Sequence, residues 1–275
     1  MKLKNVNINP AALLAEVVGT FVLATVALTI GQPLLVGLTL VVLMFAIGSI
    51  SGSHVNPVVT FGLWSIKKIE GVKVPFYWAA QFSGALFALV ATQLYSSKDL
   101  ALSFGSFTEF DAKLVVAELI GAAIFTFAIA SVVQRKESES TKAAAIGLAL
   151  MVGLYVGGGL VNQAIQNVDP TSKETPRVAK VDGIMLNPAI AIAATEKDGQ
   201  NAQALLGGQE QSESSTPASR FTLETIVGGL VGGAIGANLY MVLAGANPHA
   251  KKSVAKKVTT KVTKTVKKGA KKVKK

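Results

Sequence analysis

The chain has 275 residues, half of them hydrophobic, and a mean hydropathy of +0.47. A soluble domain is ordinarily less apolar, and the length allows several spans of about 20 residues, so we expect an integral membrane protein. The absence of cysteine excludes disulfides, thiolate metal sites and cysteine nucleophiles, and two distant histidines do not suggest a metal site. The formal charge of +11 comes from residues 251–275, which hold twelve lysines and no acid.

Six apolar segments are long enough to cross a bilayer, and they predict an all-α membrane protein. Two more apolar segments are too short to cross, and each follows an Asn-Pro dipeptide. Proline suits the first position of a helix and the preceding asparagine can cap it, so each dipeptide predicts a half-membrane helix. The predicted spans are residues 11–30, 34–50, 75–95, 112–133, 143–161 and 222–244. The predicted half-helices open at Asn56-Pro57-Val58 and Asn187-Pro188-Ala189 and continue to residues 66 and 195.

An internal repeat relates the two halves of the chain. The sequence AEVVGTF at residues 15–21 resembles AELIGAA at residues 117–123, which indicates a tandem duplication. Each copy has three full spans, an odd number, so the second copy must be inverted in the membrane relative to the first. The two half-helices are then expected to enter from opposite faces, with their positive N-termini meeting near the bilayer centre.

The charges near the spans predict the orientation. Lysine and arginine concentrate on the side that holds the N-terminus, so we expect both termini to be cytoplasmic in a multi-pass plasma-membrane protein. The other side carries more acidic residues in two long polar loops, at residues 162–185 and 196–220. We expect these loops to be exposed.

The two Asn-Pro motifs, the first within the string SGSHVNPVVT, resemble the aquaporin and glycerol facilitator family of membrane channels. Glu16 and Glu118 in the first and fourth spans, with the segment QFSGA at residues 81–85, add to the resemblance. The resemblance covers about residues 10–245, and its two repeats are at about 10–96 and 111–245. A short cytoplasmic N-terminus (1–9) is expected before this channel domain and a lysine-rich cytoplasmic tail (246–275) after it. The family implies an aquaporin-like inverted repeat, a homotetramer with one pore per subunit, and passage of water and small neutral solutes without a cofactor.

The resemblance also implies roles for individual residues. Asn56 and Asn187 are expected to donate hydrogen bonds to solutes at the pore centre, although both could merely cap their helices. Glu16 and Glu118 are expected to hold the irregular backbone of the half-helix loops, with a proton relay as the alternative. His54 is placed at the cytoplasmic pore mouth, where it would line the pore or brace the loop.

The chain departs from the family pattern at the narrowest part of the pore. The usual arginine after the second Asn-Pro-Ala is replaced by Ile190, and the predicted constriction is completed by Val36, Leu154 and Ile184. An aliphatic ring cannot hydrogen-bond a solute, so it excludes ions by desolvation. It could also favour glycerol, ammonia or gas over water.

The sequence is compatible with other functions. A structural or adhesive membrane protein with a closed pore is one alternative. We find no nucleophile–base pair, metal cluster or phosphate loop, so we do not expect an enzyme. The tail, in which like charges repel, is expected to be disordered when free. It could stay solvated or bind anionic lipid headgroups, whereas the lack of interleaved aromatic residues disfavours nucleic acid.

Overall fold

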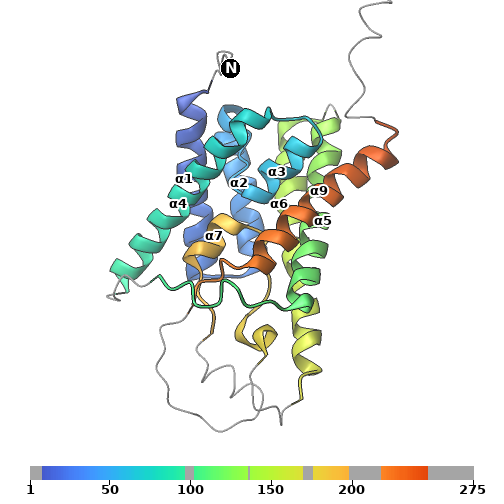
Figure 1. The fold of residues 1–275 in the computed structure, drawn as a ribbon. Helices are drawn as coiled ribbons and strands as arrows, with labels where there is room; N and C mark the ends of the chain where they lie inside the picture. The colour runs from blue at the N-terminus through green and yellow to red at the C-terminus, as the bar shows by residue number, and fades with distance from the viewer. Residues whose placement is uncertain (1–7, 97–101, 136, 170–175, 198–217, 247–275) are drawn as a thin grey trace, which may run out of the picture.

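A computed structural model describes residues 8–96, 102–135, 137–169, 176–197 and 218–246 (Figure 1). In these ranges the regular structure is helical, and six helices are long and apolar enough to cross a membrane. This confirms the predicted all-α fold with six spans and two short helices. The six long helices are α1 (Pro10–Thr29), α2 (Pro33–Ser51), α4 (Val74–Tyr95), α5 (Ala112–Gln134), α6 (Glu139–Gln166) and α9 (Leu223–Leu243). The short elements are α3 (Pro57–Ser65), α7 (Pro188–Ala193) and the 3-10 turns η1 (Gly71–Lys73) and η2 (Arg177–Lys180).

Local signals explain most helix starts. Asp111 caps α5 by accepting from the backbone N–H of Lys113, and Ser138 caps α6 by accepting from Thr141. Because of this cap, α6 begins four residues before the predicted span 143–161. It also continues to Gln166, since neither glycine nor proline interrupts residues 162–166.

The helices pack in pairs that reflect the repeat. Helix α1 packs against α4 and α5 packs against α9, while α2 packs against α6. Glycines allow these close approaches: a Cβ on Gly84 would lie 2.9 Å from the Phe21 nitrogen, and one on Gly232 would lie 2.8 Å from the Leu119 backbone. Each half-helix then packs on the last helix of the other repeat, α3 on α9 and α7 on α4.

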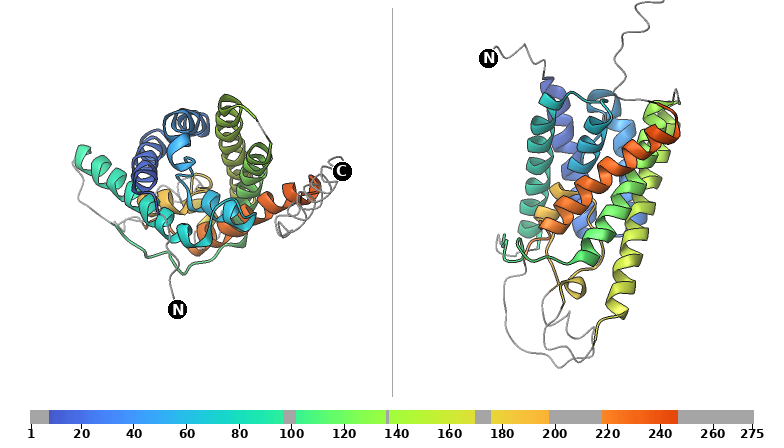
Figure 2. Two further views of the ribbon diagram at one scale, coloured as in Figure 1. Left: turned by 90° about the horizontal axis from the view of Figure 1, so that it is seen from above. Right: turned by 45° about the vertical axis from the view of Figure 1, so that its right-hand side comes forward.

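The start of α1 and the end of α9 lie at the same end of the bundle, which we call the inner end (Figures 1 and 2). The opposite end is called the outer end. Large apolar side chains cover the outside of the bundle, including Leu14, Val42, Phe45 and Val242, each more than half exposed. Such a surface suits a lipid environment.

Parts of the outer loops are buried, contrary to expectation. Arg177, Val178 and Ala179 of η2 are buried, as are Ser219 and Arg220. The prediction of exposed loops is therefore wrong for these residues, because ion pairs and backbone hydrogen bonds fasten them over the outer end. Residues 1–7, much of the loop at 196–220, and the lysine-rich tail from residue 247 onward lie outside the described residues.

Candidate functional site

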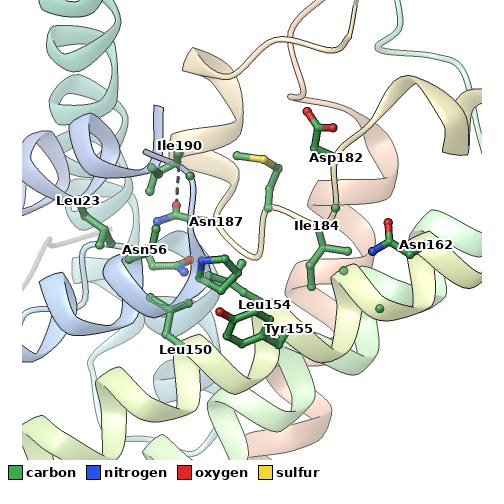
Figure 3. Close-up of a pocket in the computed structure, with 18 residues that line it drawn as sticks. Leu23, Asn56, Leu150, Leu154, Tyr155, Asn162, Asp182, Ile184, Asn187 and Ile190 are labelled. Atoms are coloured by element: carbon green, nitrogen blue, oxygen red, sulfur yellow. Dashed lines mark hydrogen bonds between the residues drawn. The ribbon is translucent and has the colours of Figure 1, made fainter. Parts of the chain in front are cut away.

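A cavity of about 470 Å³ reaches from the turn at Gly31 and Pro33, between α1 and α2, to Asn56 and Asn187. Figure 3 shows the residues that line it. Both asparagines of the Asn-Pro motifs line it, and so do the four residues of the predicted constriction. Among the described residues that line this outer cavity, Asp182 carries the single formal charge. Its lining residues are Leu23, Ala27, Gly31, Pro33, Val36, Asn56, Leu150, Leu154, Tyr155, Gly158, Gly159, Asn162, Asp182, Gly183, Ile184, Met185, Asn187 and Ile190.

The two asparagines are held by a reciprocal pair of hydrogen bonds between the repeats. The Asn56 amide nitrogen donates to the Leu186 carbonyl at 2.9 Å, and the Asn187 amide nitrogen donates to the Val55 carbonyl at 3.0 Å. Each amide oxygen caps its own half-helix, by accepting from Val58 or from the backbone after Pro188. An amide nitrogen carries two protons, so each asparagine has a second N–H beside the cavity.

Glu16 of α1 organises the loop before α3. Its fully buried carboxylate accepts from the backbone nitrogens of His54 at 2.9 Å and Val55 at 2.6 Å. It also accepts from the Ser51 hydroxyl at 2.7 Å and the Gln81 amide at 2.8 Å. Val55 has φ of 43°, a strained conformation for a β-branched residue, so these bonds fix a backbone that would not adopt this shape alone.

Glu118 of α5 has the equivalent place before α7. Its carboxylate accepts from the backbone nitrogens of Met185 at 2.7 Å and Leu186 at 2.9 Å, and Leu186 has φ of 52°. The Thr225 hydroxyl of α9 lies 3.4 Å from the same carboxylate. Each half-helix loop is thus tied to a glutamate from the first helix of its own repeat.

His54 lies at the inner end, beside a separate cavity of about 160 Å³. Its Nδ1 is 3.1 Å from the Thr60 hydroxyl, and its ring centroid lies 5.0 Å from that of Tyr77. Ring and loop are therefore fixed together, and the side chain faces the inner cavity that also contacts Met44 and Lys142.

The four aliphatic residues line the outer cavity in different ways. Val36 and Ile190 are buried in its wall, and Leu154 is partly buried. The Ile184 side chain instead occupies a notch between α5 and α6, where a Cβ on Gly121 would lie 2.5 Å from its Cδ1 and one on Gly157 would lie 2.7 Å from its Cγ1. The two glycines therefore keep much of Ile184 out of the cavity.

Comparison with known proteins decides the family. A family model described as Major intrinsic protein matches residues 3–168, which is more than half of the chain. The chain belongs to the major intrinsic protein family. Six helices within the described residues are long and apolar enough to cross a membrane, so the chain is a multi-pass membrane protein.

Curated relatives and a solved structure agree with this assignment. The chain is 46% identical over 59 residues to Aquaporin NIP2-1 from Oryza sativa subsp. japonica, an alignment that covers 22% of this chain and a fifth (20%) of that protein. It is 28% identical over 156 residues to Aquaporin Z from Photorhabdus laumondii subsp. laumondii, an alignment that covers 52% of this chain and 68% of that protein. The aquaglyceroporin from Plasmodium falciparum shares the fold, with a TM-score of 0.53 at 21% identity over 84% of this chain and 94% of that one.

One feature of this major intrinsic protein was missed in the sequence, a buried charge network at the outer end. The Arg177 guanidinium contacts Glu196 at 2.6 Å and Glu224 at 2.7 Å, and Arg220 lies nearby. Burial lowers the pKa of Arg220, while the carboxylates of Glu118 and Glu196 raise it, and an arginine in this setting stays protonated. Basic residues within mainly acidic loops were the available signal, but the Arg177 partners Glu196 and Glu224 lie 19 and 47 residues away in sequence.

Proposed function

We propose that this protein is a passive channel for water and small uncharged solutes, in which the outer cavity is the solute path. The observation that carries the proposal is the pair Asn56 and Asn187, which share one cavity and are locked by bonds to each other's loops. An amide offers a hydrogen bond without a charge, so it replaces water around a neutral solute without trapping it.

The aliphatic wall sets what can reach the asparagines. We propose that Val36, Leu154 and Ile190, with the part of Ile184 that its notch leaves in the cavity, form the narrow part of the path. A neutral solute loses a few hydrogen bonds there, whereas an ion loses its hydration at a far larger cost. Gly158 and Gly159 open the same region, since a Cβ on either would meet no atom within 4 Å. This room favours solutes of glycerol size alongside water.

The structural roles follow from the same contacts. We infer that Glu16 and Glu118 act as braces for the two half-helix loops and that His54 braces the inner mouth. We also propose a homotetramer in the plasma membrane with both termini cytoplasmic. The lysine-rich tail would then face the anionic cytoplasmic leaflet, whose headgroups it could bind.

The test is an osmotic assay on the full chain in liposomes, followed by light scattering. An impermeant osmolyte reports water flux, and a glycerol gradient reports entry of the larger solute as reswelling. Fast shrinkage with fast reswelling is expected. Flux equal to that of empty vesicles would contradict the proposal and favour a closed, structural protein.

Asn56→Ser separates pore lining from capping. Serine is a good helix cap, so α3 should keep its start, but the amide donors are lost. We expect normal assembly with water and glycerol flux reduced about tenfold, equivalent to about 1.4 kcal/mol of barrier. Unchanged flux in correctly assembled protein would leave Asn56 as a cap alone.

A further inference from the structure

A buried arginine lies directly behind the wall of the proposed solute path. Arg220 lines a second cavity, of about 600 Å³, which adjoins the outer cavity and which we call the side cavity. Arg220 is itself 7% exposed. The residues that line both cavities, and so form the wall between them, are Ala27, Gly31, Asp182, Gly183, Ile184, Met185 and Ile190.

The guanidinium is bonded to this wall. Its Nη2 donates to the Gly183 carbonyl at 2.7 Å, and Gly183 is followed by the pore residue Ile184. The Arg220 backbone is also fixed, because its N–H donates to the Ala194 carbonyl at 2.8 Å and its carbonyl accepts from the Thr225 hydroxyl. The positive charge therefore has a defined position relative to the solute path.

The preceding residue fastens the same segment to the second half-helix. The Ser219 hydroxyl lies 3.0 Å from the carbonyls of both Ala191 and Ile192, near the end of α7. These carbonyls are among those that a helix leaves without a partner at its C-terminus. Arg220 and α7 are thus parts of one rigid assembly.

The charged groups around Arg220 determine what the loss of its positive charge would do. Glu118 lies behind the wall at Met185 and Leu186, whereas Asp182, which lines both cavities, is paired with Lys197. The nearby Arg177 is already paired with Glu196 and Glu224. Without Arg220, the wall would therefore be backed by excess negative charge, and charges in a buried, low-dielectric setting act strongly over short distances.

We propose that Arg220 is an ion-excluding residue of the outer path, which acts through the Gly183–Ile184 wall instead of from within the pore. The inference rests on the proposed channel function. Apart from Asp182, the wall supplies aliphatic groups and backbone amides, and the uncharged Ile190 stands three residues after Asn187. The cation behind that wall opposes the entry of cations from the outer end.

The first experiment compares three charge variants with the wild-type chain in liposomes. Arg220→Gln removes the charge and keeps a donor, Arg220→Lys keeps the charge, and Lys180→Gln removes a positive charge that lines neither cavity. Water flux is measured by light scattering, and the cation leak by the decay of an imposed potassium gradient. We expect Arg220→Gln to raise the leak per unit water flux at least tenfold, with Arg220→Lys and Lys180→Gln near wild type.

A second pair of variants leaves Arg220 unchanged, so its structural contacts are kept. Thr195 is exposed and lines the side cavity with Arg220. Thr195→Asp should offset the cation and raise the leak, whereas the similar but neutral Thr195→Asn should not. An equal leak in these two variants, with water flux intact, would overturn the proposal and leave Arg220 as a structural brace. Wild-type chain without water flux would instead overturn the channel function itself.

Discussion

Two adjacent glycines on α6 provide a sharp test of what sets the width of the path. A Cβ on Gly157 would lie 2.7 Å from Ile184 Cγ1, closer to Ile184 Cδ1, and 3.0 Å from the Ala117 carbonyl oxygen. A Cβ on Gly158, which lines the outer cavity, would meet no atom within 4 Å. The same substitution at neighbouring positions should therefore have very different effects.

In Gly157→Ala, Ile184 must leave its notch, and the cavity is the space open to it. A shift of about 1.5 Å restores ordinary contact, and such overpacking costs about 1–3 kcal/mol of stability. We expect glycerol flux to fall about tenfold, while water flux falls about twofold, because the smaller solute needs less width. Gly158→Ala should leave both fluxes within about twofold of wild type, since one methyl is small against the cavity. Stopped-flow light scattering on matched proteoliposomes measures both fluxes.

The double variant Gly157→Ala with Ile184→Ala identifies the cause. If Ile184 blocks the path, shortening it should restore glycerol flux in the Gly157→Ala background. A glycerol-to-water ratio unchanged by Gly157→Ala would refute the reasoning about the notch. Failure of the double variant to recover would attribute the loss to displacement of α6 from the Ala117 carbonyl.

Two further predictions concern the loop brace and the missing cation. Glu16→Leu leaves the buried N–H groups of His54 and Val55 without their acceptor, which costs about 1–3 kcal/mol of stability each. The yield and thermal stability of assembled protein should therefore fall more than the flux per channel. Normal yield with abolished flux would argue for a direct role of Glu16 in conduction. Ile190→Arg places a long cation in the outer cavity and should reduce glycerol flux more than water flux in the liposome assay. An unchanged ratio would count against Ile190 as part of the constriction.

The helical framework could be predicted from sequence because its signals are local. Hydropathy over about 20 residues marks a span, and Asn-Pro marks the start of a half-helix within two positions. The end of α7 was less predictable. It stops at Ala193, two residues before the predicted limit, because Thr195 pairs as an isolated bridge with Ser219 across the outer loop.

The shape of the path depends on contacts that no local pattern reports. The position of Ile184 beside the path could be predicted from its spacing to Asn187. Its notch could not, because it is made by Gly121 on α5 and Gly157 on α6, which are distant in sequence. Glycines in apolar spans predict close helix packing in general. They do not say which side chain from a distant loop fills the space that they leave.

The two half-helix loops bind their backbone N–H groups with a buried glutamate each, but the groups around the two glutamates differ. Each loop must hold exposed backbone donors in the membrane interior. The inner loop uses neutral donors around Glu16, including the Ser51 hydroxyl and the Gln81 amide. The outer loop uses fewer donors around Glu118 and adds the charge of Arg220. Gly157 contacts Ile184 from α6, whereas Arg220 bonds Gly183 from the side cavity. If the two proposals hold, we expect solute size and ion exclusion to respond to separate substitutions although both depend on the same short loop.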